Sequence, residues 1–492
     1  MKLSYGSVAS PLIRNPRDIP RSEKYDSDSD DDFSYEVLVQ KADAFTLPFD
    51  EDRGFRGTEL RLLSFERPHM RAFHGSWICN FVSTFVQFAI APLLPEIKIS
   101  LNLAKSEIWT SNIWSSIGGV PLLFMLGSFS DKYGGRFMAT LLLALMAVPC
   151  ALTGLVTSLN GLLFVRLIIG SLDNSVPCQY WISCHFVREI SGTAMAMSSG
   201  LGATGSGLVQ LFVGSILFSF CLLLTGNNAD LAWRLALILP GLMAFMTAVF
   251  FFLYSEDCPL GNHSVVKKAG LMMERSAMDS FRSGALNLNS WILFLQFAGS
   301  GGVDLTMSNG AAIYYHDRFS QSTASSGAVA CLYGLSAVFA RGVGGYISDE
   351  MFKRMSMKGR LWTQMTSMFI QGLFAIYWSN LTSFKSSVIM MVIFSIVVQI
   401  SIGACYSIVP YVDGMNTGSV AGIVGAGGNV GAIILGLQFR RADYADAAEY
   451  MGWFTIALAL LTPLIVIKGY RGLLFGREES GQATLLLPPQ AR

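Results

Sequence analysis

The residues of this chain that could do chemistry are a few charged and polar side chains inside long apolar segments. Arg341 lies eight residues before Asp349 in one such segment, and Asp304 lies in the segment before it. A guanidinium is planar, stays charged and offers several N–H donors, so it suits a small trigonal oxyanion. Charged groups inside membrane segments are costly and usually functional. We therefore expect Arg341 to bind an anion, the alternative being a buried ion pair with an acid.

Two acids, Asp304 and Asp173, lie inside apolar segments. Asn309, Tyr314 and Tyr315 follow Asp304 in the same segment, and we expect them to contribute to the same binding site. Asp173 follows Arg166 by seven residues, which would place both on roughly one face of an unbroken helix. A structural ion pair is the alternative interpretation of Arg166 and Asp173.

Two motifs occur twice, about half a chain apart. Residues 127–131, Gly-Ser-Phe-Ser-Asp, are repeated 218 residues later as Gly-Tyr-Ile-Ser-Asp at 345–349. The glycine-rich run 200–205 is echoed at 425–431, with an offset of 226 residues between the final glycines. Two unrelated motifs that recur at nearly the same offset predict that one half of the chain is a duplicate of the other. In transporters built from such repeats the substrate lies near the bilayer midplane, between the halves.

The repeated aspartate motif predicts a gate. Asp131, with Lys132 and Arg136 close behind it, lies between the second and third apolar segments, and Asp349 takes the same place in the second half. An acid at a helix end with nearby cations could hold one face closed until the halves rock. A solvated charged turn is the alternative.

The first glycine run matches the Gly-x-Gly-x-x-Gly dinucleotide fingerprint. That fingerprint requires a strand before it and a helix after it, whereas this run lies inside an apolar segment. Small residues in membrane helices allow close backbone approach instead. We therefore expect the glycines of both runs to line crossings between the halves, with Gly202, Gly205, Gly427 and Gly428 next to the substrate. The other glycines of this prediction are Gly200, Gly207, Gly425 and Gly431.

The composition is that of a membrane protein. Hydrophobic residues make up 52% of the chain and charged residues only 14%, against about 25% charged in soluble domains. A helix needs about 20 apolar residues to span a bilayer. Twelve segments qualify: 72–97, 108–130, 137–157, 160–183, 193–222, 232–254, 289–313, 324–348, 361–380, 386–410, 419–438 and 450–469. The sequence predicts an all-α membrane protein with twelve transmembrane helices in two six-helix halves.

Loops and tails define the remaining organisation. We expect a disordered acidic tail at 1–66, a first half at 67–254, a central loop at 255–288, a second half at 289–470 and a C-terminal tail at 471–492. Loops on the side of both tails carry eleven lysines and arginines, against six on the other side. Positive charge favours the cytoplasmic side, so both termini, the central loop and both tails are expected in the cytoplasm.

Several other classes of protein are disfavoured. The eight cysteines contain no Cys-x-x-Cys pattern and the five histidines are scattered, so we expect no metal site and no cofactor. We also expect no enzymatic activity and no nucleic-acid partner.

Taken together, these residues resemble the nitrate/nitrite porters of the major facilitator superfamily, in particular the eukaryotic high-affinity branch. The resemblance extends over residues 67–470, and its most specific part is the segment 421–431. Further matching segments are 67–74, 101–106, 178–181, 232–241 and 339–341.

The resemblance implies a twelve-helix carrier that moves nitrate together with protons, and Asp304 and Asp173 are the candidates for carrying the proton. It also implies a clamp of one arginine from each half, with one asparagine from each glycine run. Arg341 and Asn429 match the second-half members. Leu123 and Ala203 stand at the two first-half positions, and Asp173 replaces a small neutral residue. For some eukaryotic members, the resemblance implies a small single-span partner subunit.

The leading hypothesis is a proton-coupled carrier of nitrate, nitrite or a related small anion, working by alternating access. The departures at Leu123 and Asp173 leave open a carrier of a neutral or cationic solute. A membrane sensor that signals through the acidic tail is a third alternative. The plasma membrane is the expected location, with the vacuolar membrane as the alternative.

Overall fold

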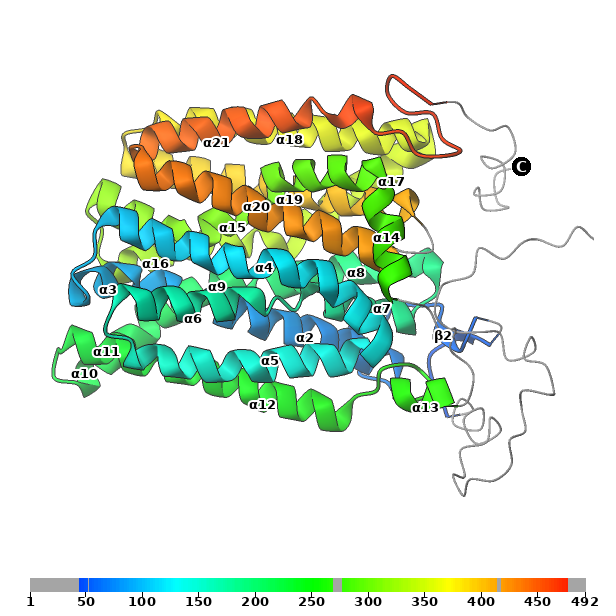
Figure 1. Ribbon diagram of the computed structural model, residues 1–492, viewed down its shortest axis with the longest axis horizontal. Coiled ribbons are helices and arrows are strands. Elements are labelled where there is room, and N and C mark those ends of the chain that lie inside the picture. Colours follow the sequence, from blue (N-terminus) through cyan, green and yellow to red (C-terminus); the bar gives the residue numbers. More distant parts are fainter. Residues whose placement is uncertain (1–43, 52, 269–276, 414–416, 477–492) are drawn as a thin grey trace, which may run out of the picture.

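The computed structural model describes residues 44–51, 53–268, 277–413 and 417–476 (Figure 1). Its helices run side by side along the long axis of the molecule. One end of the bundle carries the β1–β2 hairpin and the C-terminal segment, and we call it the terminal face. The opposite end, which carries α3, α10 and α11, is called the distal face.

The first half consists of helices that form six consecutive passes between the two faces. In chain order the passes are α2 (His69–Gln87) with η3 (Ala91–Leu93) and α3 (Leu94–Ser100); α4 (Lys105–Tyr133); α5 (Gly135–Leu152) with η4 (Thr153–Leu155); α6 (Leu159–Ser171) with α7 (Ser175–His185); α8 (Arg188–Ala203), α9 (Gly205–Leu211), η5 (Phe212–Leu217) and α10 (Phe218–Leu224); and α11 (Ala229–Ala236) with α12 (Ile238–Tyr254).

The second half repeats this pattern with six further passes. They are α15 (Leu288–Phe319); α16 (Thr323–Leu335) with α17 (Ala337–Met355); α18 (Met357–Ser379); α19 (Phe384–Val412); α20 (Thr417–Arg441); and α21 (Tyr444–Ala459) with η6 (Thr462–Leu464). Within the described residues, ten helical passes are long and apolar enough to cross a membrane. The helices α15 and α18 complete the twelve, so the predicted all-α fold is confirmed.

The segments between and before the halves are more structured than expected. The strands β1 (Phe49–Asp50) and β2 (Arg56–Gly57) form an antiparallel hairpin, and the Val187 N–H donates to the Gly57 carbonyl at 3.1 Å. Residues before position 67, within the expected tail, are thus part of the fold. The central segment contains α13 (His263–Lys268) and α14 (Ala277–Leu286), and α14 packs against α20 and α4. The acidic block and the C-terminal tail beyond 476 lie outside the described residues.

Two antiparallel helix pairs join the halves. In the first pair, α4 with α20, Trp109 stacks on Phe439 at 4.6 Å between ring centroids, and a Cβ at Gly127 would lie 3.0 Å from the Gly418 carbonyl oxygen. In the second pair, α9 with α16, a Cβ at Gly334 would lie 2.4 Å from the Gly207 Cα. The second contact continues between α8 and α17, so the halves meet along two seams.

Two glycines of the first run lie between the halves as expected, because a Cβ at Gly200 would lie 3.1 Å from the Ala337 carbonyl and one at Gly207 2.7 Å from the Leu335 nitrogen. The four glycines expected next to the substrate lie instead at crossings within a half. A Cβ at Gly202 or Gly205 would collide with α2, at 2.2 Å from the Asn80 amide nitrogen or from the Phe81 carbonyl. A Cβ at Gly427 would lie 2.1 Å from the Phe294 carbonyl of α15, and Gly428 faces Phe297. That prediction is therefore wrong for these four positions. In each half, the helices of the first and fifth passes therefore approach each other closely at these glycines, which the spacing of glycines in the sequence did not indicate.

The fourth pass is broken at mid-length, between α6 and α7. Leu172 leaves the helical conformation, and the Ser175 N–H donates to Asp173 Oδ1 at 2.7 Å. The Asn174 amide donates to the Ala139 carbonyl at 3.1 Å. Asp173 therefore binds the first N–H of α7 from the position before the N-cap residue, Asn174, whose own side chain makes no capping bond, and we refer to this contact as the capping of α7 by Asp173. The break also removes the regular spacing that would place Asp173 on one face with Arg166.

Candidate anion site between the halves

Arg341 lies at the centre of a polar cluster in the middle of the bundle. It projects from α17, and its Nε and Nη2 both donate to Gln399 Oε1, at 3.0 and 2.7 Å. Its Nη2 also lies 3.2 Å from Asp304 Oδ2, and its Nη1 donates to Ser199 Oγ at 3.1 Å. The Gln399 amide donates to Asp304 Oδ1 at 2.8 Å, which closes the cluster.

This cluster brings two predicted residues together and adds two that sequence reasoning missed. Asp304 comes from α15, Gln399 from α19 and Ser199 from α8 of the first half. The side chains of Arg341 and Asp304 are 12% and 18% exposed, so the ion pair borders open space. The polar character of Gln399 within an apolar helix was the one signal in the sequence that could have identified it.

Two glycines on the terminal side of Arg341 border open space. Gly345 lies one turn after Arg341 on α17, and a Cβ built there would meet nothing within 4 Å. The same holds for Gly418 on α20. The distal side is sealed more tightly, as described below.

Asn429 lies on the other seam, where α20 meets α4. It is buried, and a Cβ at Gly119 would come within 2.8 Å of its Oδ1. Leu123, one turn further along α4, is also buried and faces α20, at 4.0 Å from a Cβ at Gly425. The first half thus presents an apolar side chain to the interface at the position where the resemblance implies an arginine.

Asn309 does not join the Arg341 cluster. It accepts a hydrogen bond from Arg166 Nη2 at 2.6 Å, and its own amide donates to the Leu305 carbonyl at 3.1 Å. The alternative of an ion pair between Arg166 and Asp173 is wrong, because Asp173 instead caps α7 across the helix break. Arg166 and Asn309 form a second polar contact between the halves.

Tyr314 and Tyr315 also lie apart from Arg341. They follow Asp304 by ten and eleven residues, which corresponds to roughly 15 Å along α15. Tyr314 accepts a hydrogen bond from Arg318 at 3.0 Å, and the hydroxyl oxygens of Tyr315 and Ser387 are 3.2 Å apart. Both tyrosines therefore pack within the second half, near the distal face.

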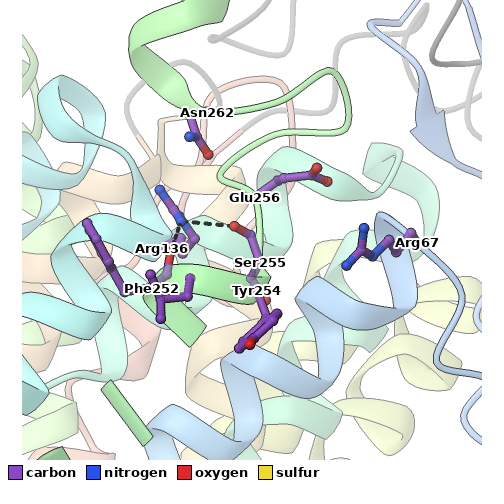
Figure 2. A pocket seen from close by; sticks show the side chains of 8 residues that line it. Arg67, Arg136, Phe252, Tyr254, Ser255, Glu256 and Asn262 are labelled. Carbon is purple, nitrogen blue, oxygen red and sulfur yellow. Dashed lines mark hydrogen bonds between the residues drawn. The ribbon is translucent and has the colours of Figure 1, made fainter. Parts of the chain in front are cut away.

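The residues expected to form a gate at the terminal face bond within their own halves. Asp349 pairs with Arg360 at 2.7 Å. Arg136 donates to the carbonyls of Phe252 and Ser255 at 2.5 and 2.9 Å, beside a cavity of about 280 Å³ that Figure 2 shows at the end of α12. Lys132 is exposed, and the Asp131 side chain lies outside what the structure describes. These contacts brace each half, and their gating role stays a prediction.

Contacts that the sequence did not indicate join the two halves at the distal face, and we call them the distal gate. Lys98 of the first half lies 3.2 Å from Asp317 of the second, and the Tyr444 hydroxyl donates to Asp317 at 2.9 Å. Thr323 donates to Glu96 at 2.6 Å across the same boundary. Lys98 and Asp317 are 219 residues apart, so sequence spacing gave no sign of the pair.

Removal of the Asp317 charge is expected to loosen this distal gate. In Asp317→Asn the half-buried ion pair is lost, which should shift the closed-to-open ratio about tenfold or more, since a charge-assisted hydrogen bond contributes about 1.5–3 kcal/mol. Spin labels at positions 102 and 321, in distal loops of opposite halves, should report longer distances. The exposed Asp446→Asn serves as the control. An unchanged distance distribution in Asp317→Asn would show that the pair does not hold the gate.

The model of the Major Facilitator Superfamily matches residues 76–436. High-affinity nitrate transporter 2.3 of rice is 34% identical over 447 residues, covering 89% of this chain and 85% of the relative. High affinity nitrate transporter 2.5 of Arabidopsis thaliana is 34% identical, covering 88% and 86%.

More distant similarities extend to bacteria. The nitrate/nitrite transporter NrtP of Picosynechococcus is 25% identical over 451 residues, covering 73% of this chain and 83% of the relative. Among solved structures, a bacterial homologue of the human lysosomal transporter Spinster superposes with a TM-score of 0.58 at 14% identity, covering 80% of this chain and 95% of that one. That likeness concerns the fold.

Proposed function

Because the chain belongs to the nitrate/nitrite porter family of the major facilitator superfamily, we propose that it is a secondary transporter of nitrate, nitrite or a closely related small oxyanion. The observation that carries the proposal is Arg341, a guanidinium held between the halves with open space beside it. The substrate names of the relatives point to the same class of ligand. Transport proceeds by alternating access, in which the halves rock about the seams α4–α20 and α9–α16.

Anion binding and proton binding are coupled at Arg341. In the present arrangement, Asp304 and Gln399 accept the hydrogen bonds that a planar oxyanion would accept. A proton on the Asp304 carboxylate removes its negative charge and weakens its hold on Arg341. The guanidinium is then available to the anion, so proton and anion bind together. This competition supports symport of one anion with protons.

The departures in the first half favour one second candidate. Leu123 faces the interface where the resemblance implies an arginine, and Asp173 adds a carboxylate. A site with fewer positive charges could accept a neutral or cationic solute. The structure gives Asp173 a capping role, which accounts for this residue without a change of substrate.

Flux measurements in vesicles test the proposal. The purified chain in proteoliposomes should take up labelled nitrate against its gradient when the outside is acidic, and nitrite should compete. Movement of another solute without nitrate flux would replace the proposed substrate, and binding without flux would favour a sensor. Flux from the chain alone would also exclude a requirement for a single-span partner subunit.

We further propose that the terminal face is cytoplasmic and that the protein resides in the plasma membrane. Thr382 is exposed on the distal loop after α18, within the sequon Asn380-Leu-Thr382. Thr382→Cys should react with a membrane-impermeant maleimide in intact cells, whereas Lys353→Cys, exposed near the terminal face, should react only after permeabilisation. The reverse pattern would invert the orientation, and protection of both positions would argue for an internal membrane.

A further inference from the structure

A second arginine is buried between the halves without a counter-charge. The Arg166 side chain is only 2% exposed, and its one hydrogen bond in the described structure runs from Nη2 to Asn309 Oδ1 at 2.6 Å. Its Nε and Nη1 have no hydrogen-bond partner among the described residues. No ion pair to Arg166 is formed within the same part of the chain.

Such an arrangement is unfavourable unless something else binds there. Buried polar groups are normally hydrogen-bonded, and a buried charge is normally paired. A guanidinium stays protonated, so it cannot escape the cost by losing its charge. A water molecule would supply hydrogen-bond acceptors but no negative charge. A small monovalent anion would supply both.

An additional unpartnered donor lies at the same level. Asn112 is buried, and neither atom of its amide has a partner among the described residues. It lies one turn along α4 from Trp109, whose ring abuts Gly310, next to Asn309. Asn112 also lies one turn from Ser115 on α4. The Ser115 carbonyl abuts Gly170, which follows Arg166 by one turn on α6. Asn112 therefore lies on the stretch of α4 that packs against both Gly310 of α15 and Gly170 of α6.

We propose that Arg166, Asn309 and Asn112 form a second binding subsite for a small monovalent anion, distal to Arg341. Asn309 follows Asp304 by five residues on α15, a rise of about 7.5 Å towards the distal face. The subsite therefore lies between the Lys98–Asp317 gate and the Arg341 cluster. An anion entering from the distal side meets Arg166 first and Arg341 second.

The subsite deepens the proposed function, on which it rests for the identity of the ligand. The first half lacks an arginine at Leu123, and Arg166 restores a positive charge from that half at a different depth. Since Arg166 and Asn309 come from opposite halves, the subsite is assembled when the distal side closes. The chain thus binds its anion at two successive arginines.

Anion-dependent thermal stabilisation of the purified full-length protein tests this subsite, with nitrate and bromide as probes. Arg341→Gln should retain a rise in melting temperature with either anion, because the second subsite remains. Adding Arg166→Gln to that background should remove the rise, with at least a tenfold loss of anion affinity. Arg234→Gln, which removes an arginine already paired with Asp230 at 3.1 Å, is the matched control and should retain the rise.

Asn309→Asp gives a second test that does not depend on tolerance of a lost arginine. It keeps the side-chain shape and brings a carboxylate to Arg166, so the protein without anion should become more stable and the second anion should no longer bind. An unchanged anion titration in Arg166→Gln and Asn309→Asp would overturn the subsite, even if nitrate flux is normal. Anion binding that depends on Arg166 in a protein without nitrate flux would retain the subsite and overturn the proposed function.

Discussion

Arg341→Lys is expected to lower nitrate uptake about 100-fold or more, nearly as far as Arg341→Ala. Lysine keeps the positive charge, so Asp304 retains a counter-ion and the fold should persist. It cannot reproduce the fork that donates from Nε, Nη1 and Nη2 to three partners. Loss of two charge-assisted hydrogen bonds to the anion, at about 1.5 kcal/mol each, corresponds to roughly two orders of magnitude in affinity.

Initial rates of nitrate uptake in proteoliposomes, normalised to the amount of folded protein, measure this effect. Arg234→Lys is the control, because Arg234 lies near the distal face and pairs with Asp230 on the same helix. Alanine at position 341 should also destabilise the protein, since it leaves the Asp304 carboxylate buried without its partner. If Arg341→Lys transports at the normal rate, Arg341 does not bind the substrate through its planar fork.

Asp304→Asn is expected to abolish proton-driven accumulation of nitrate while exchange of nitrate for nitrate continues. The amide cannot take up a proton, so the variant has no carrier for the coupling ion at this position. The amide oxygen can still accept from Gln399, whose amide lies 2.8 Å from Asp304 Oδ1. Without the competing carboxylate, Arg341 should also bind nitrate more tightly at neutral pH.

Two assays on the same vesicles separate these effects. Under an imposed pH gradient, nitrate inside vesicles with Asp304→Asn should rise only to the outside concentration. Counterflow of labelled nitrate in the same vesicles should persist. Asp173→Asn is the matched control, because an asparagine can also cap α7 by accepting from the Ser175 N–H. Accumulation that survives in Asp304→Asn and disappears in Asp173→Asn would assign the proton to Asp173.

Much of the fold could be predicted from the sequence, because a bilayer imposes a simple rule on a spanning helix. Each pass needs about 20 apolar residues, and its backbone must be satisfied within the helix. The twelve apolar segments and the repeated motifs therefore determined the passes and the two halves. The passes extend beyond the apolar segments, as α15 does at Leu288–Phe319, because polar residues continue a helix outside the hydrocarbon layer.

The same rule singled out the residues that break it. Arg341 and Asp304 were candidates from sequence alone, because a charge in an apolar helix requires a reason. Their partnership was only one of the alternatives, since the residues lie on different helices, 37 positions apart. Which helices are neighbours is a property of the packed bundle. Hence Ser199, Gln399 and the pair Lys98–Asp317 could be recognised only in the structure.

Local geometry decided the rest of the site. The spacing of seven residues predicted that Arg166 and Asp173 share one helix face. The helix breaks after Ser171, so that Asp173 accepts a hydrogen bond from the start of α7 and Arg166 donates to Asn309 instead. The glycine runs correctly indicated close packing, whereas the crossing that each glycine serves depends on how the helix is rotated in the bundle. The sequence by itself determined the class of protein and its charged centre. Only the tertiary structure decided the partners, because side chains far apart in the chain meet through the packing of helices.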